Sequence, residues 1–235
     1  MAKLFILIIL SFAQAACAKA NSTEKPQGTQ TKLVPTVYYH PILKIDSNSC
    51  DSNKLVDLTN TKNQKVATIC KDDIVNCARQ GSCTIENQGK NIHIAYETRK
   101  KGVTYFEEIS LEKCAYGFGV KNICIDPYHS VAADLTIYKT GAVIYLPSVR
   151  GTILPTGETH DGYFIVRDTG QAIVGLGRFD FYTGYEHPND QSNPFGKLKL
   201  HDPKMTVDYQ LVSDEAIIKQ VHNARSFPLV PKMNY

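Results

Sequence analysis

Tryptophan is absent from the 235-residue sequence, and neither sign of charge is in marked excess. Lysine and arginine number 26 and aspartate and glutamate 23, and Lys3 and Lys19 lie in a segment that we expect to be removed, which leaves 24 basic residues. Binding to a phosphate backbone needs a positively charged surface, so we expect no nucleic-acid partner. The apolar fraction of 43% is typical of a folded globular protein rather than a disordered chain.

Long apolar runs are missing beyond the first twenty residues. Leu4 to Phe12 is almost wholly apolar, follows Lys3 and precedes the small-residue segments Ala13-Gln14-Ala15 and Ala18-Lys19-Ala20. A run of about nine residues is too short for a transmembrane span, which takes about 20. The pattern predicts a signal peptide over residues 1–20 and export, to the periplasm or the medium. Cys17 leaves open a lipoprotein site, although the residues before it lack a Leu-x-x-Cys pattern.

Cysteine is absent after Cys124, and the cysteines that follow Cys17 include no Cys-x-x-Cys pair. His93 is the only histidine between the first and last of them, so zinc ligation is disfavoured and we expect no metal or other cofactor. An even number of cysteines in an exported chain instead predicts three disulfides. The pairs between sequence neighbours, Cys77–Cys83 and Cys114–Cys124, are plausible. The six residues are Cys50, Cys70, Cys77, Cys83, Cys114 and Cys124.

The mature chain opens with a polar segment and continues as many short strands. Residues 21–34 lack an apolar period, and we expect them to be a flexible N-terminus. Short β-branched or aromatic runs bounded by Gly, Asn and Asp then predict strands. This pattern indicates a barrel or a sandwich. The expected strands cover residues 36–39 with 42–43, then 65–70, 91–96, 103–106, 133–138, 142–146, 162–167, 171–174 and 178–182.

Two minor helices are expected. One covers Glu107 to Cys114, and the other is capped by Ser213, runs to Asn223 and has acids in its first turn. The sequence shows no internal repeat and no long linker, so we expect a single domain over residues 35–225. A C-terminal tail follows over residues 226–235, where Pro228 and Pro231 disfavour a helix.

Acidic residues and glycines are dense between Gly157 and Tyr185. In an extended 178–182 segment, the two-residue period places Arg178, Asp180 and Tyr182 on one face and two phenylalanines on the other. Asp168 ends another expected strand and precedes a Thr-Gly turn, and Asp134 lies at the head of a third. The candidate catalytic residues are Asp134, Asp168 and Asp180, and the candidate substrate-binding residues are Arg178 and Tyr182.

Three segments in this region resemble a known family. They read SVAADLTIYKTGAVIYLP, DGYFIVRDTGQAIVG and GRFDFYTG, and they are similar to the 3D domain, named for three aspartates, of the membrane-bound lytic transglycosylase A family and related secreted cell-wall proteins. The resemblance covers about residues 128 to 186. It is weaker in two further segments, TVYYHP at Thr36 to Pro41 and ARQGSCTIENQGK at Ala78 to Lys90. It implies a double-psi β-barrel in which a cysteine-rich insertion, about residues 45–127, elaborates the barrel. It also implies that the second large domain of the full-length transglycosylases is missing.

The same resemblance implies roles for the three acids. Asp180 matches the position that serves as acid and base, and Asp168 and Asp134 match the acids gathered around it. The implied reaction is lytic transglycosylation of peptidoglycan glycan strands, in which the 6-hydroxyl of N-acetylmuramic acid attacks its own anomeric carbon. Gln171 and Val174 stand where the family usually has Gly and Lys, which bears on substrate preference. A free Asp has a pKa of about 3.9, so burial or neighbouring acids would have to keep Asp180 protonated.

Three other functions fit parts of the pattern. A noncatalytic wall-binding module could use the same barrel, because a fold does not fix a function. Asp168-Thr169-Gly170 also occurs in aspartic proteases, but only one copy is present and Arg167 stands directly before it. A lysozyme-like hydrolase would use two of the acids and leave ordinary reducing ends.

His160 stands beside Asp161, and the two could form a catalytic dyad only if both side chains faced the same side. Adjacent residues of a strand point to opposite faces, so we do not expect this dyad.

Overall fold

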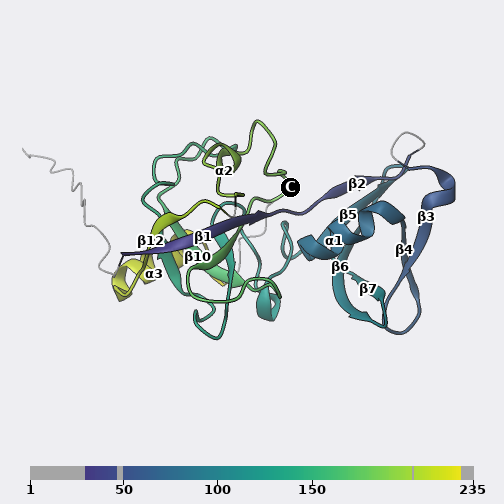
Figure 1. The fold of residues 1–235 in the computed structure, drawn as a ribbon, viewed down its shortest axis with the longest axis horizontal. Coiled ribbons are helices and arrows are strands. Elements are labelled where there is room, and N and C mark those ends of the chain that lie inside the picture. Colours follow the sequence, from purple (N-terminus) through teal and green to yellow (C-terminus); the bar gives the residue numbers. More distant parts are fainter. Residues whose placement is uncertain (1–29, 47–49, 203, 229–235) are drawn as a thin grey trace, which may run out of the picture.

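The computed structural model describes residues 30–46, 50–202 and 204–228. The expected signal peptide, Cys17 and most of the expected C-terminal tail lie outside these residues. Figure 1 shows two lobes side by side, with the long strand β1 (Gln30–Tyr38) crossing the first lobe and leading directly into the second. Residues 30–34, which we expected to be flexible, are part of this strand. No helix among the described residues is long and apolar enough to cross a membrane.

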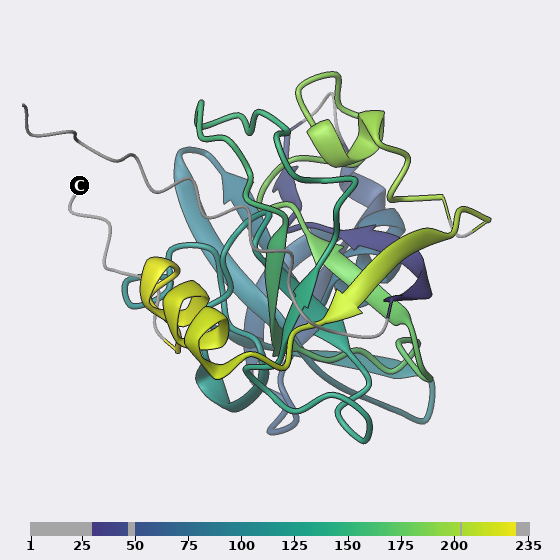
Figure 2. The same ribbon diagram turned by 90° about the vertical axis from the view of Figure 1, so that its left-hand side faces the viewer.

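The first lobe is a closed barrel of six strands in the order β1-β11-β8-β10-β9-β12, and it faces the viewer in Figure 2. Buried side chains from every strand fill it, among them Phe179 and Phe181, which are 0% exposed. Two of its strand pairs are parallel (β1 with β11, β8 with β10), and the other four are antiparallel. The predicted double-psi β-barrel fold class is confirmed. The further strands are β8 (Ser130–Ala133), β9 (Val143–Tyr145), β10 (Tyr163–Asp168), β11 (Arg178–Tyr182) and β12 (Val207–Leu211).

Short helices cover the barrel. α2 (Pro194–Lys197) is capped by the Asn193 side chain, and η3 (Val120–Asn122) lies in the segment that leads back to the barrel. The helix expected near the C-terminus is present as α3 (Glu215–Ala224), but its cap is Asp214 rather than Ser213, because the Asp214 carboxylate accepts bonds from the first-turn amides. Its apolar face packs against β9 and β10.

The second lobe is inserted between β1 and β8 and has its own hydrophobic core. A four-stranded sheet, order β2-β5-β6-β7, faces a two-stranded hairpin of β3 and β4. This lobe covers most of the cysteine-rich insertion expected over about residues 45–127, and it buries an apolar cluster of its own. Its elements are β2 (Ile42–Lys44), η1 (Ser52–Lys54), β3 (Leu55–Thr59), β4 (Lys65–Cys70), η2 (Lys71–Asp73), α1 (Ile74–Gln80), β5 (Ser82–Asn87), β6 (Lys90–Lys100) and β7 (Val103–Glu108).

Three disulfides form, as predicted. Cys77–Cys83 and Cys114–Cys124 are the expected neighbour pairs, and Cys50–Cys70 is the third. Two of them lie within the second lobe, and Cys114–Cys124 closes the loop through which the chain returns to the barrel. Cys77 and Cys83 belong to the apolar core of the second lobe, and a cross-link stabilises a small unit by restricting its unfolded chain.

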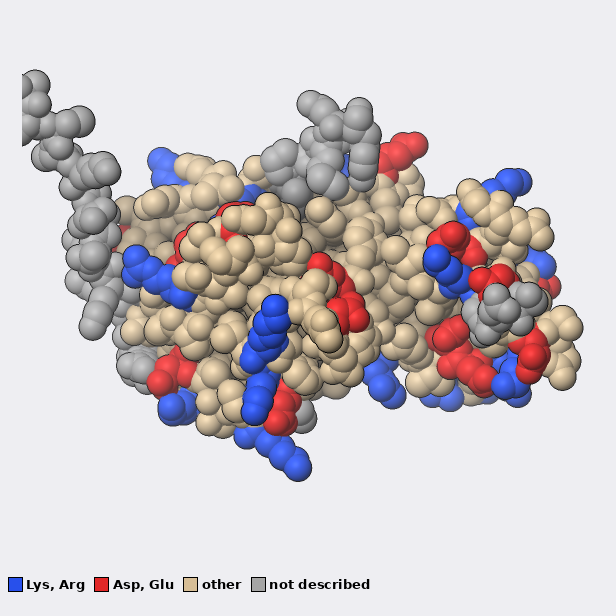
Figure 3. Space-filling model, turned by 90° about the horizontal axis from the view of Figure 1, so that it is seen from above, with Lys and Arg blue, Asp and Glu red and all other residues tan. Residues whose placement is uncertain are grey.

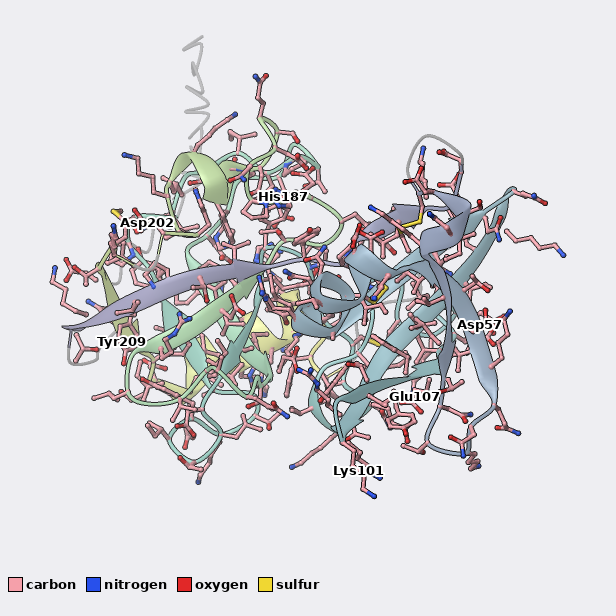
Figure 4. The ribbon with its side chains drawn as sticks, turned by 45° about the vertical axis from the view of Figure 1, so that its right-hand side comes forward. Asp57, Lys101, Glu107, His187, Asp202 and Tyr209 are labelled. Atoms are coloured by element: carbon pink, nitrogen blue, oxygen red, sulfur yellow. A yellow bond between two sulfur atoms is a disulfide. The ribbon has the colours of Figure 1, made fainter. Side chains whose placement is uncertain are left out.

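The lobes meet at the end of β1. The His40 amide donates to the Gly184 carbonyl of the barrel at 2.7 Å. Its ring nitrogens lie 2.9 Å from Ser82 Oγ and 2.8 Å from Thr84 Oγ1 in the second lobe. Burial lowers the pKa of His40 to about 4, so the ring is neutral near pH 7. Tyr39 stacks edge-on against His187 with 4.9 Å between ring centroids, and Figure 4 labels His187 on the barrel.

Three expected elements are wrong. Residues 107–114 do not form a helix, because Glu107 and Glu108 extend β7 and pair with Ala95 and Ile94 of β6. The strand expected over 133–138 ends at Ala133, where Asp134 begins a turn. Residues 171–174 lie in a loop that begins with a turn, rather than in a strand. Strands β3, β5 and β12 were not predicted.

Candidate active site

Asp180 lies in the middle of β11 on the outer face of the barrel. Its Cα partners are Thr36 on β1 and Ala132 on β8. The neighbouring Phe179 and Phe181 point into the barrel core, so the alternation predicted for 178–182 is confirmed. Three adjacent strands therefore contribute to the surroundings of one carboxylate.

The Asp180 carboxylate is short of hydrogen-bond partners. Its Oδ1 atom is buried and has no partner among the described residues. Burial raises the pKa of Asp180 to about 6, and the charge of Asp168 adds to the rise. The Thr36 hydroxyl and the Arg178 guanidinium lower the same pKa. A carboxyl in this setting is partly protonated near neutral pH, as a general acid requires.

Asp168 reaches the same outer face from the end of β10. A register shift in the β8–β10 pairing follows Val166, so that Asp168, like Asp180, has Ala132 as its Cα partner. The Tyr38 hydroxyl donates to Asp168 Oδ2 at 3.0 Å, and the Thr169 amide donates to Oδ1 at 2.8 Å. Burial raises the pKa of Asp168 to about 6, although both donors lower it.

An apolar layer on this face explains the burial of the two acids. Tyr38, Ile125, Ala132, Ile173 and Tyr182 form a cluster separate from the barrel core, with Tyr116 packed against it. Their side chains remove water from the carboxylates, and desolvation disfavours the charged form of an acid.

Tyr38 is a site residue that the sequence analysis missed. Its ring packs on Tyr182 at 4.9 Å between centroids, and its hydroxyl bonds Asp168. Burial and the charges of Asp168 and Asp180 raise the pKa of Tyr38 well above 10, so it remains a donor. The two-residue spacing of Thr36 and Tyr38 indicates that they share one face of β1. Their register opposite Asp180 and Tyr182, which places Tyr38 at the site, comes from the structure and could not be read from the sequence.

Asp134 is placed differently from the other two acids. It follows β8 instead of starting a strand, and no interaction with Asp168 or Asp180 is found among the described residues. Its Oδ1 accepts from the Thr136 amide at 2.9 Å, and its Oδ2 accepts from the Gly175 amide at 2.9 Å. These donors lower the pKa of Asp134. Asp134 thus fastens the loop of residues 170–177, which borders the site.

The two candidate binding residues also make specific contacts. Arg178 Nη1 donates to the Val34 carbonyl at 3.1 Å, and its charge favours ionised Asp180. Tyr182 is 1% exposed, and its hydroxyl donates to the Tyr116 carbonyl at 2.6 Å. Arg178 is half-buried at the edge of the site, whereas Tyr182 packs beneath it.

Comparisons with known proteins bear on the domain and the fold. Residues 129–200 match the family model of the 3D domain. Among solved structures, MltA from E. coli with bound chitohexaose has a TM-score of 0.54 at 13% identity, covering 77% of this chain and 72% of that one. The lytic transglycosylase LtgG of Burkholderia pseudomallei has a TM-score of 0.43 at 14% identity and covers 79% and 73%. A membrane-bound lytic murein transglycosylase from Agrobacterium tumefaciens has a TM-score of 0.44 at 15% identity and covers 79% and 75%.

No curated protein matches the sequence. The region matched by the family model contains β8 to β11, and with them Asp134, Asp168 and Asp180. Residues 129–200 therefore match the 3D domain, and the fold of the chain is similar to that of MltA.

Proposed function

We propose that the protein cleaves the β-1,4 bond between N-acetylmuramic acid and N-acetylglucosamine in peptidoglycan by lytic transglycosylation, leaving 1,6-anhydro ends. The observation that carries the proposal is the state of Asp180, whose desolvated Oδ1 lacks a partner and whose pKa is raised to about 6. The 3D domain and the MltA-like fold support the choice of substrate.

The reaction requires one group that first gives a proton and then takes one. Protonated Asp180 donates to the glycosidic oxygen as the bond from that oxygen to the anomeric carbon breaks. The 6-hydroxyl of the same muramic residue then forms the new bond to the anomeric carbon and passes its proton to Asp180. Protons and bonds balance without water, and the acid returns to its starting state.

The surrounding residues keep Asp180 ready for this cycle. Asp168, held by Tyr38 and Thr169, supplies a negative charge that favours the protonated form of Asp180. Asp134 is a positioning residue that fixes the loop at Gly175. Arg178 contacts the glycan at the edge of the site. Tyr182, by contrast, shapes the floor through its packing on Tyr38.

We also propose that the protein acts outside the cytoplasm, in the periplasm or the medium. The signal-peptide pattern of residues 1–20 and the three disulfides support export. The natural partner would be the glycan strand itself. Basic and acidic side chains are interspersed on the face seen in Figure 3, so no field of one sign covers that face.

Product analysis tests the proposal. Purified sacculi are digested with the wild-type protein, and the soluble fragments are analysed by mass spectrometry. We expect fragments with 1,6-anhydro ends, each one water lighter than a hydrolysis product. Reducing ends would contradict transglycosylation and indicate a lysozyme-like hydrolase. Binding to sacculi without any release of fragments would contradict an enzyme and indicate a wall-binding module.

A further inference from the structure

A second cluster of titratable side chains lies near the opposite end of β10 from Asp168. His129 directly precedes β8, and His160 and Asp161 precede β10. Because β8 and β10 pair in parallel, their N-terminal ends meet at one edge, and the Ile165 amide donates to the His129 carbonyl at 2.9 Å. The two imidazoles stack with 4.5 Å between centroids. Asp161 and Asp168 are roughly 20 Å apart along the strand, so this cluster is distinct from the candidate active site.

His129 is buried without hydrogen bonds. Its side chain is 4% exposed, and neither Nδ1 nor Nε2 has a hydrogen-bond partner among the described residues. Burial lowers the pKa of the ring to about 2, and a contact with the Tyr163 backbone, whose geometry falls short of a hydrogen bond, opposes this shift. A buried polar group without a partner is uncommon and calls for a ligand, a water or an ion.

Donor atoms of the right types surround this ring. One ligand atom each from His129, His160 and Asp161 lies within 4.8 Å of the others. His129 Nε2 is 3.8 Å from Glu158 Oε1, and His160 Nδ1 is 3.7 Å from Asp161 Oδ1. Neutral imidazoles with carboxylates are a donor set that suits Zn²⁺.

The outer contacts resemble those that orient metal ligands. His160 Nε2 lies 2.7 Å from the Tyr128 carbonyl, which places the proton there and leaves a lone pair on Nδ1. Arg225 binds Glu158 Oε1 at 2.6 Å and Asp161 Oδ2 at 3.2 Å, and so holds both carboxylates while Asp161 Oδ1 remains on the side of His160. Hydrogen bonds of this kind fix the orientation of ligating groups.

We propose that His129, His160 and Asp161, with Glu158 as a fourth ligand at the solvent edge, bind a zinc ion that ties the start of β8 to the start of β10. At zinc bond lengths of about 2.0–2.2 Å, the ligand atoms draw together to about 3.3 Å. His160 Nδ1 then gives up the bond of 2.8 Å that it accepts from the Gly162 amide. Arg225 keeps its contact with Asp161 Oδ2. The sequence analysis looked for zinc only among the cysteines, and the spacing of His129 and His160 follows no short motif.

Zinc titration of the tag-free, chelator-treated protein tests this site. We expect one equivalent of Zn²⁺ to bind, measured by calorimetry, and to raise the Tm. His129→Gln should abolish both effects, and Glu158→Gln, at the exposed edge, should weaken binding at least about tenfold. His187→Gln removes a histidine outside the cluster and should bind like wild type. Circular dichroism of the zinc-free variants shows whether each is folded. If His129→Gln does not fold, zinc binding by Glu158→Gln tests the site.

Several results would overturn the site. The proposal fails if wild type binds no zinc, or if His129→Gln and Glu158→Gln bind it as tightly as wild type. Loss of binding in His187→Gln would place the ion elsewhere. X-ray absorption at the zinc edge should show nitrogen and oxygen ligands with two imidazoles, and sulfur scattering would contradict the assignment. None of these readouts depends on glycan cleavage.

Discussion

Asp168 and Asp180 flank the same residue, Ala132, which is the Cα partner of both. They come from different strands, β10 and β11, that lie on either side of β8. Ala132 contributes only a methyl group between them and is itself 3% exposed. Two acids thus share one desolvated surface, and the pKa of each is raised to about 6.

The first prediction concerns the cost of burying Asp180. Its pKa is about 6 in the folded protein and about 3.9 in an unfolded chain, so the ionised carboxylate destabilises the fold above pH 6. That cost disappears as the pH falls from 6 towards 4, because the folded state takes up the proton first. Asp180→Asn should therefore raise the free energy of unfolding at pH 7.5 by up to about 3 kcal/mol. Urea unfolding at pH 7.5 and pH 4.5 checks this, and an equal effect at both values would contradict it.

The rate of glycan cleavage should fall as Asp180 loses its proton. With the pKa of Asp180 raised to about 6, we expect kcat/KM to decline above pH 6, by about tenfold for each further pH unit. Asp168 titrates in the same range, so the profile reports the pair rather than one residue. The measurement is fragment release from sacculi between pH 4.5 and 8.5. A rate that climbs through pH 8 would show that a deprotonated group, and not a general acid, limits the reaction.

The Tyr38 hydroxyl should act on Asp180 through Asp168. Removing this donor raises the pKa of Asp168, which then carries less charge near pH 6 and raises the pKa of Asp180 less. Tyr38→Phe should move the alkaline limb of the pH profile to lower pH and reduce the rate at pH 7 by roughly 3- to 10-fold.

Tyr39→Phe is the matched control for Tyr38→Phe. The Tyr39 hydroxyl accepts a bond from Asn76 in the second lobe rather than from the acids. The pH profile of Tyr39→Phe should coincide with that of wild type. If the pH profile moves equally in both variants, or in neither, the Tyr38 hydroxyl does not act on Asp180 through Asp168.

Much of the barrel could be predicted from the local pattern of apolar and polar residues in the sequence. The alternation of Arg178 to Tyr182 predicted the strand, its two faces and the outward position of Asp180 correctly. Asp134 misled the strand prediction because its carboxylate caps the Thr136 amide, and a side chain that bonds the nearby backbone ends a strand. Periodicity does not reveal such a bond.

The position of Asp168 could not be derived from the same rules. In a regular strand it would face the barrel core with Val166, since residues two apart share a face. The irregularity after Val166 adds one residue opposite β8 and turns Asp168 outward, as β-bulges beside active sites do. Bulges arise from the pairing of distant strands, so a single strand's sequence carries no mark of them. The resemblance to the 3D domain grouped Asp168 with Asp180, and periodicity alone would not have done so.

The loop contact of Asp134 gives a further prediction. In Asp134→Asn, Oδ1 can still accept from Thr136, but an amide nitrogen facing the Gly175 N–H cannot accept its bond. The loop of residues 170–177 should loosen, and cleavage should slow by roughly tenfold while the pH profile keeps its shape. Steady-state rates across the pH range check this. A changed alkaline limb would mean that Asp134 acts on Asp180 directly.

The most direct test of the account is the digestion of sacculi by wild type and Asp180→Asn side by side at pH 5.5, with anhydro-ended fragments counted by mass spectrometry. Asparagine has nearly the same shape but neither gives nor takes the proton. We predict that the variant folds, binds sacculi and releases at least about a thousandfold fewer such fragments. Release at the wild-type rate by folded Asp180→Asn would show that another group carries the proton.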